Sequence, residues 1–145
     1  AASAVTRLAD MGVEPYLITS TVRGILAQRL LRTLCAGCRQ AYEESPEMVR
    51  ALGLDRLTAG TVPTLYHAQG CAECGATGYA GRTSVSELLL VSEPIRALVL
   101  DRADANDIEK AARAEGMERM REDGLRQVLA GVTTVEEVLR VTQES

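Results

Sequence analysis

The chain has 145 residues, of which 46% are hydrophobic, 25% are charged and 3% are aromatic. These proportions exclude an intrinsically disordered chain and predict a folded core built from aliphatic side chains. The formal net charge of −4 argues against nucleic-acid binding, and no apolar run approaches the roughly 20 residues that cross a bilayer. We therefore expect a soluble intracellular protein without a transmembrane segment.

Two helices are predicted at the start of the chain. Apolar spacing indicates the first over residues 1–12, where Gly12 ends it. The second begins at Pro15, because the first turn of a helix does not need the N–H that proline lacks. Apolar residues continue at spacings of three and four to Ile25 and Leu26, so we expect this helix to extend that far.

A short aliphatic strand over residues 29–34 is then expected to deliver Cys35 from the edge of a sheet. Residues 39–69 form an excursion with a helix start at Ser45-Pro46 and an extended segment over residues 61–66. The excursion is too short to build a core of its own. A bound metal would supply much of its folding free energy, and removing the metal should unfold residues 35–80 before the C-terminal helices.

The last part of the chain is predicted to be a strand followed by helices. A glycine-rich connector over residues 75–82 precedes the strand at residues 83–91. Glycine-rich loops bind phosphate when they join a strand to a helix, whereas this one joins a cysteine pair to a strand, so a phosphate site is the weaker interpretation. Helix starts recur in residues 92–145, at Ser92-Glu93-Pro94, at Asp104, and at Thr134 with Glu137 as a capping box.

All four cysteines lie in two C-x-x-C pairs, separated by 32 residues. Each pair can present two thiolates from a tight turn, and two such turns complete the tetrahedral four-thiolate site that zinc prefers. We therefore predict one structural zinc ion with four ligands, namely Cys35, Cys38, Cys71 and Cys74. Such a closed site leaves no position for a reacting water, so the metal is expected to be structural and not catalytic, and no catalytic residue is predicted in the chain.

Other interpretations of the cysteines remain open. Disulfide bonds would need an oxidising compartment, although no secretory signal is visible. A thioredoxin-like redox site would need only one of the pairs. His67 lies four residues before Cys71 and is an alternative metal ligand.

The residues around the cysteines resemble two halves of a family signature. The first half is Ala27-Gln28-Arg29-Leu30 leading into Leu34-Cys35-x-x-Cys38, and the second is Gly70-Cys71-x-x-Cys74-x-x-Thr77-Gly78-Tyr79-x-Gly81-Arg82-x-x-x-x-Glu87-Leu88. The similarity continues at residues 121–125 and 131–138 and so covers nearly the whole chain. It resembles the C-terminal part of the ATPases of bacterial type II secretion and type IV pilus assembly, the GspE/PilB group of traffic ATPases.

The resemblance implies an α/β fragment with four parts. Residues 1–34 would end a RecA-like ATPase core, residues 35–80 would form an inserted tetracysteine zinc-binding module, residues 81–91 would be the return strand of the core, and residues 92–145 would form a C-terminal helical domain. The chain has no initiator methionine, and Ala1-Ala2 matches the residues that follow the histidine-containing box of that family, so we expect a fragment.

The resemblance also implies a parent protein that hydrolyses ATP with magnesium, assembles as a hexamer and powers protein export. Such a protein would be cytoplasmic and would reach the inner membrane through a platform protein and other secretion-system partners. The Walker A and B motifs would lie upstream, so the fragment alone is not expected to hydrolyse ATP. By position, Arg82 would be the best candidate for a residue near bound nucleotide, and Arg29 is a weaker one. The alternative for each is a solvated or ion-paired arginine.

Two other function classes compete with this interpretation. A free-standing, zinc-stabilised adaptor that binds only protein partners would carry the same cysteines. A zinc-ribbon nucleic-acid binder is disfavoured by the acidic net charge and by the lack of Phe and Trp.

Overall fold

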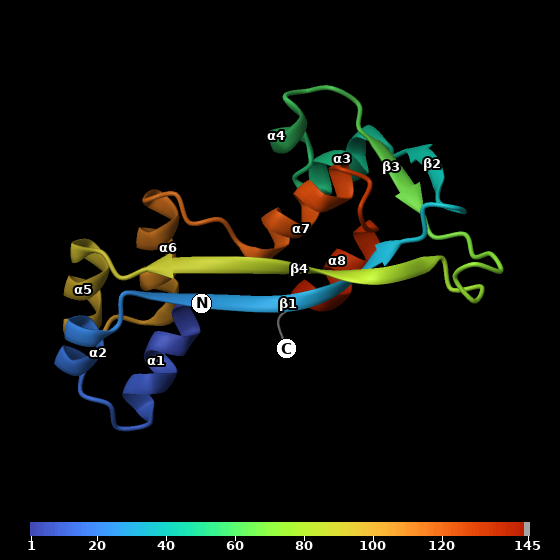
Figure 1. Ribbon diagram of the computed structural model, residues 1–145. Coiled ribbons are helices and arrows are strands. Elements are labelled where there is room, and N and C mark those ends of the chain that lie inside the picture. Colours follow the sequence, from blue (N-terminus) through green and yellow to red (C-terminus); the bar gives the residue numbers. More distant parts are fainter. Residues whose placement is uncertain (144–145) are drawn as a thin grey trace. The chain divides into compact units, whose positions relative to one another are not determined.

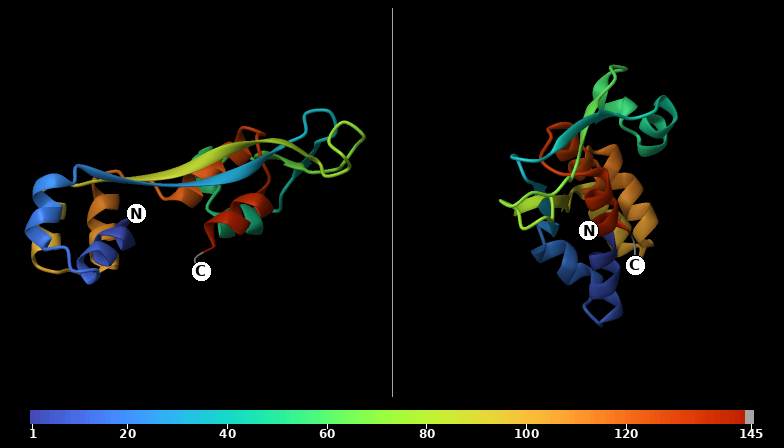
Figure 2. Two further views of the ribbon diagram at one scale, coloured as in Figure 1. Left: turned by 60° about the horizontal axis from the view of Figure 1, so that its bottom comes forward. Right: turned by 90° about the vertical axis from the view of Figure 1, so that its right-hand side faces the viewer.

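The computed structural model describes residues 1–143 and divides the chain into two compact units. Unit 1 consists of residues 1–28 and 86–119, and unit 2 consists of residues 29–85 together with the chain from residue 120 onward. Two long strands, β1 (Gly24–Leu34) and β4 (Tyr79–Leu90), are hydrogen-bonded to each other and contribute to both units (Figure 1). They lie side by side in both views of Figure 2.

Unit 1 packs four helices against the start of β1 and the end of β4, next to which the Val91 amide donates to the Arg23 carbonyl at 3.0 Å. The helices are α1 (Ala2–Asp10), α2 (Pro15–Thr21), α5 (Glu93–Leu100) and α6 (Ala105–Ala114). The core is aliphatic, as composition predicts, and is formed by Ala2, Val5, Ile18, Leu89, Val91, Ile95, Val99, Ile108 and Ala112.

The second helix is shorter than the sequence predicts. It ends at Thr21 instead of Leu26, and Ile25 belongs to β1. β-Branched and hydroxyl residues in its last turn weaken the helix, because such side chains lose rotamer freedom or bond to nearby carbonyls. The Thr21 hydroxyl, for example, donates to the Leu17 carbonyl at 2.5 Å. Pairing with β4 then decides the conformation of the residues that follow.

Unit 2 contains a second strand pair, and two short helices lie between its strands in the chain. The strands are β2 (Gln40–Glu43) and β3 (Thr64–His67), which run antiparallel with Gln40 opposite His67 and Glu43 opposite Thr64. The helices of this unit are α3 (Pro46–Leu52), α4 (Asp55–Thr58), α7 (Met120–Leu129) and α8 (Val135–Thr142).

The predicted helix starts are confirmed in three places. The Ser45 hydroxyl accepts a hydrogen bond from the Met48 amide at 3.2 Å, and a carboxylate oxygen of Asp104 accepts one from the Asp107 amide at 2.9 Å. The Thr134 hydroxyl accepts from the amide of Glu137 at 3.1 Å. Among the described residues, no helix is both long enough and apolar enough to cross a membrane.

The core of unit 2 is shared between the excursion and the C-terminal helices. It contains Leu31, Val49, Leu54, Leu65, Val85, Leu125, Val128, Val138 and Val141. Helices α7 and α8 approach closely at Gly124, where a Cβ atom would lie 2.7 Å from Cγ1 of Val138. This sharing changes the expectation that residues 35–80 would unfold before the C-terminal helices, because the excursion and α7–α8 support the same core.

A buried carboxylate joins α8 to β1. The side chain of Glu137 is 1% exposed and accepts five hydrogen bonds from two arginines. Arg32 donates through its backbone amide at 2.9 Å and through its guanidinium at 3.1 and 3.0 Å. Arg140 donates at 3.1 and 2.6 Å, and the Arg32 guanidinium also lies 4.1 Å from the ring centroid of Tyr79.

These contacts determine the ionisation of Glu137. Burial alone raises the pKa of its carboxyl, but the hydrogen bonds from Arg140 and Arg32 outweigh burial and lower the pKa to about 2. A carboxyl whose pKa is lower in the folded state stabilises the fold above its ordinary pKa near 4.5, and this contribution disappears as the pH falls toward 2.

We predict that Glu137→Gln lowers the free energy of unfolding by about 2–3 kcal/mol at pH 7, because it leaves two guanidinium groups facing an uncharged amide. Glu136→Gln is the matched control, since Glu136 is the neighbouring carboxylate on the same helix and is less buried. Urea unfolding from pH 7 down to pH 3 measures both variants. The difference between them should shrink below pH 4.5, and acid effects on the cysteines cancel because both variants retain them. Equal stability of the two variants at pH 7 would contradict the prediction.

Candidate metal centre

Two segments that are distant in the sequence bring the four cysteines together in unit 2. β1 ends at Leu34 and is followed directly by the first pair, Cys35 and Cys38. The second pair, Cys71 and Cys74, lies in the connection between β3 and β4. The amide of Cys35 donates to the Gly78 carbonyl at 2.9 Å, so the backbone itself links the two segments.

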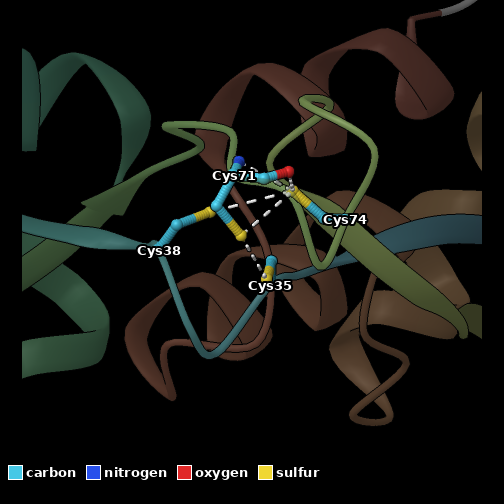
Figure 3. A group of neighbouring side chains, drawn as sticks. All are labelled: Cys35, Cys38, Cys71 and Cys74. Atoms are coloured by element: carbon cyan, nitrogen blue, oxygen red, sulfur yellow. Dashed lines mark hydrogen bonds between the residues drawn. The ribbon is translucent and has the colours of Figure 1, made fainter.

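The four sulfur atoms lie at distances that suit a tetrahedral metal site (Figure 3). The Sγ atoms of Cys35 and Cys71 are 3.9 Å apart, as are those of Cys38 and Cys74, while Cys71 and Cys74 are separated by 3.7 Å. All four atoms lie within 4.8 Å of one another. Four sulfurs bound at about 2.3 Å around one ion would be roughly 3.8 Å apart, which is close to these distances.

The alternative interpretations of the cysteines fit less well. A disulfide needs sulfur atoms about 2.0 Å apart, and all four cysteines are free thiols. A redox dithiol would use one pair, whereas both pairs converge on one point. His67 is not part of the cluster, and its ring stacks on Tyr42 with the centroids 3.7 Å apart.

Backbone amides point at two of the sulfur atoms. Gly70 donates to Sγ of Cys38 at 3.3 Å, and the amides of Cys71 and Gly78 each donate to Sγ of Cys74 at 3.2 Å. The hydrogen bond from Cys71, followed by that from Gly78, lowers the pKa of Cys74 to about 6 against the effect of burial. At Cys38 the loss of solvation outweighs the bond from Gly70 and raises the pKa to about 12.

Two glycines allow the second cysteine pair to fold against the strand that follows. Gly70 has a φ of +100° and Gly78 a φ of +79°, both in the left-handed region that favours glycine. A Cβ on Gly70 would lie 2.7 Å from the Ala76 carbonyl oxygen, and one on Gly78 would lie 2.7 Å from Cβ of Ala68. Both positions therefore need glycine for conformation and for space.

The chemistry of the donors restricts which metal fits. Four cysteine sulfurs in a tetrahedral arrangement select zinc or an iron–sulfur centre over the hard, oxygen-seeking ions magnesium and calcium. Because all four donors come from the protein, a bound ion would have no free position for substrate. The four cysteines are therefore a possible structural metal site.

Arg82 and Arg29, the two arginines expected near nucleotide, are not among the residues of the sulfur cluster and differ in their contacts. Arg82 is exposed on β4, and its guanidinium makes no hydrogen bond or ion pair with another described residue. Arg29 is exposed on β1, and its guanidinium donates to the Val141 carbonyl at 2.5 Å.

Sequence reasoning missed Arg39, which directly follows the first cysteine pair. Its guanidinium lies 4.3 Å from the ring centroid of Tyr66 and donates to the Gly131 carbonyl at 2.6 Å. Cysteine spacing could not reveal this residue, because its partner is far away in the sequence. The only local signal was a basic residue next to a cysteine pair.

We predict that Gly78→Ala weakens zinc binding by about 10–100-fold, as loss of an outer-shell contact commonly does. The added methyl would collide with Ala68 and move the amide that bonds to the Cys74 sulfur. Gly60→Ala is the control, because Gly60 has a similar φ of +83° but a Cβ added there would meet no atom within 4 Å. Competition with a chelator measures both affinities. An equal loss in the two variants would mean that backbone strain alone explains the effect.

Comparison with known proteins places the whole sequence in one group. Residues 1–140 match the family described as "Type II/IV secretion system protein". The chain is 45% identical to type II secretion system protein E of Pseudomonas aeruginosa, over 99% of this chain and 28% of that protein. It is 44% identical to the type IV pilus assembly ATPase PilB of Thermus thermophilus, over 99% of this chain and 16% of that protein.

A third relative, type II secretion system protein E of Dickeya dadantii, is 48% identical over 99% of this chain and 28% of its own length. The chain thus spans between 16% and 28% of the length of these relatives. The match extends across both units and the four-cysteine segment, and it confirms the resemblance found in the sequence. The chain belongs to the family of type II and type IV secretion system proteins and aligns with part of the ATPases of type II secretion and type IV pilus assembly.

Proposed function

We propose that this chain is the C-terminal region of a hexameric ATPase that powers protein export or pilus assembly, and that its four cysteines bind one structural zinc ion. The convergence of four sulfur atoms within 4.8 Å is the observation that carries the zinc proposal. Family membership supports the motor proposal. Zinc, when bound, would supply four strong bonds that cross-link the two cysteine pairs.

Within that protein, residues 1–34 and 81–91 would belong to a RecA-like core, residues 35–80 would form the zinc module, and residues 92–145 would form a C-terminal helical domain. The pairing of β1 with β4 supports the assignment of both strands to one sheet, since they flank the cysteine segment in the chain. The zinc module would then be an insertion between neighbouring strands of the motor domain.

ATP and magnesium would bind to parts of the whole protein that are not in this sequence. The sequence has no GxxxxGK[ST] loop, which is the element that holds the β- and γ-phosphates in such ATPases. We propose that this chain does not hydrolyse ATP on its own. The whole protein would act in the cytoplasm and contact an inner-membrane platform and other secretion-system proteins, a proposal that family membership supports.

The zinc proposal predicts one zinc ion per chain in protein purified under reducing conditions. Cys71→Ser should reduce zinc content well below one equivalent, because three thiolates remain. His67→Ala is the control and should retain a full equivalent, since the His67 ring stacks on Tyr42 outside the sulfur cluster. Elemental analysis provides the measurement, and reduced wild-type protein without stoichiometric zinc would refute the proposal.

Arg82 is the residue that we propose to lie near nucleotide in the whole protein. Its exposed guanidinium has no hydrogen-bond partner among the described residues and is thus available to a phosphate. Arg82→Ala in the whole ATPase should raise KM for ATP by about tenfold, the loss expected for one charge-assisted hydrogen bond. Arg56→Ala, at an exposed position on α4, should leave KM unchanged. Equal KM values for the two variants would exclude a contact between Arg82 and nucleotide.

A further inference from the structure

The turn between α7 and α8, residues 131–134, is held by residues that flank the cysteine pairs. Each residue of this α7–α8 turn makes one such bond. Arg39 donates to the Gly131 carbonyl at 2.6 Å, the Leu34 amide to the Val132 carbonyl at 2.8 Å, the Thr133 hydroxyl to the Arg32 carbonyl at 2.8 Å, and the hydroxyls of Tyr79 and Thr134 lie 2.8 Å apart.

The partners of the turn surround the metal centre on both sides. Leu34 directly precedes Cys35, and Arg39 directly follows Cys38. Tyr79 follows Gly78, whose amide bonds to the sulfur of Cys74. A metal bound by the four sulfurs would therefore fix the backbone at each of these points, because a structural metal site contributes its binding free energy to the folding of its ligand loops.

Arg39, which follows Cys38, connects the loop of the first cysteine pair to the turn through its side chain. Its guanidinium is oriented by two contacts, one with the ring of Tyr66 and one with the Gly131 carbonyl. Gly131 has a φ of +74°, and a Cβ at this position would lie 2.7 Å from Nη1 of Arg39 and 3.0 Å from Cε2 of Tyr66. A side chain at position 131 would therefore displace the Arg39 guanidinium or press against the Tyr66 ring.

Helix α8 begins one residue after the turn and depends on it. Thr134 caps the helix through the amide of Glu137, and its hydroxyl lies within hydrogen-bond distance of Tyr79. Val138 and Val141 of α8 then pack into the core of unit 2. Besides the shared core, this turn is thus a polar route by which a movement of the loop after the first cysteine pair would reach α8.

We propose that metal occupancy of the four cysteines controls the order of the α7–α8 turn and of α8, and that Arg39 transmits this control. The inference rests on the zinc site proposed above and goes beyond it. The bound metal would then stabilise the folded conformation of the C-terminal helix pair, in addition to cross-linking its own loops. Loss of the metal frees Arg39 from the Gly131 carbonyl, and the turn loses its fixed conformation.

Amide hydrogen exchange of the zinc-loaded whole protein tests whether metal occupancy controls the order of the turn and of α8. Removing zinc from the wild-type protein with a chelator should raise exchange at residues 131–142 by at least about tenfold, which corresponds to the loss of one or two hydrogen bonds. Exchange in α5 and α6 of unit 1 should not change, because these helices belong to a different core. Unchanged exchange at residues 131–142 after verified zinc removal would overturn the inference.

Arg39→Ala separates the effect on the turn from metal binding itself. This variant should retain one zinc ion per chain and yet show exchange at residues 131–142 that approaches the chelated wild type. Arg56→Ala, an exposed arginine in the same unit, should behave like the wild type. Wild-type exchange in the zinc-loaded Arg39→Ala protein would exclude Arg39 as the transmitter. If the wild-type protein held no zinc, the zinc proposal would fail at the earlier step, which elemental analysis detects independently.

Discussion

Four ionised thiols cannot stay within 4.8 Å of one another without a cation between them, because the mutual repulsion of like charges favours their protonation or separation. The pKa values of Cys74 and Cys38 shift in opposite directions, because hydrogen bonds from the backbone amides of Cys71 and Gly78 lower the pKa of Cys74 whereas burial raises that of Cys38. The two cysteine loops nevertheless converge, and glycines at positions 70 and 78 occupy the points where a side chain would collide. The four sulfur atoms therefore form a possible metal site, and hydrogen bonds join the loops that carry them to the turn between α7 and α8.

The excursion that carries the cysteines and the C-terminal helices form one packing unit. Val49 and Leu65 of the excursion lie in the same core as Leu125 and Val138 of the helices. Polar contacts reinforce this core at its edge, where the α7–α8 turn meets the cysteine loops. A metal site and a small helix pair that would each be marginal alone can in this way stabilise each other.

Local signals in the sequence predicted the local features well. The cysteine spacing identified the four sulfurs that converge, and side-chain caps located the starts of three helices. The boundary between α2 and β1 was wrong because apolar residues at Val22, Ile25 and Leu26 also satisfy helical spacing. Pairing with β4, which lies far along the chain, determined that boundary. The contacts of Glu137 with Arg32 and of Arg39 with Gly131 were not predictable, since no periodicity specifies a partner about a hundred residues away.

The five hydrogen bonds of Glu137 also have a consequence for the alignment of α8. A slide of this helix by one turn would move the carboxylate about 5.4 Å along the helix axis, out of reach of the donors on Arg32. The apolar residues of α8 would tolerate such a slide better, because aliphatic contacts are not directional. Glu137 therefore selects one position of α8 along its axis among those that the apolar core alone would accept.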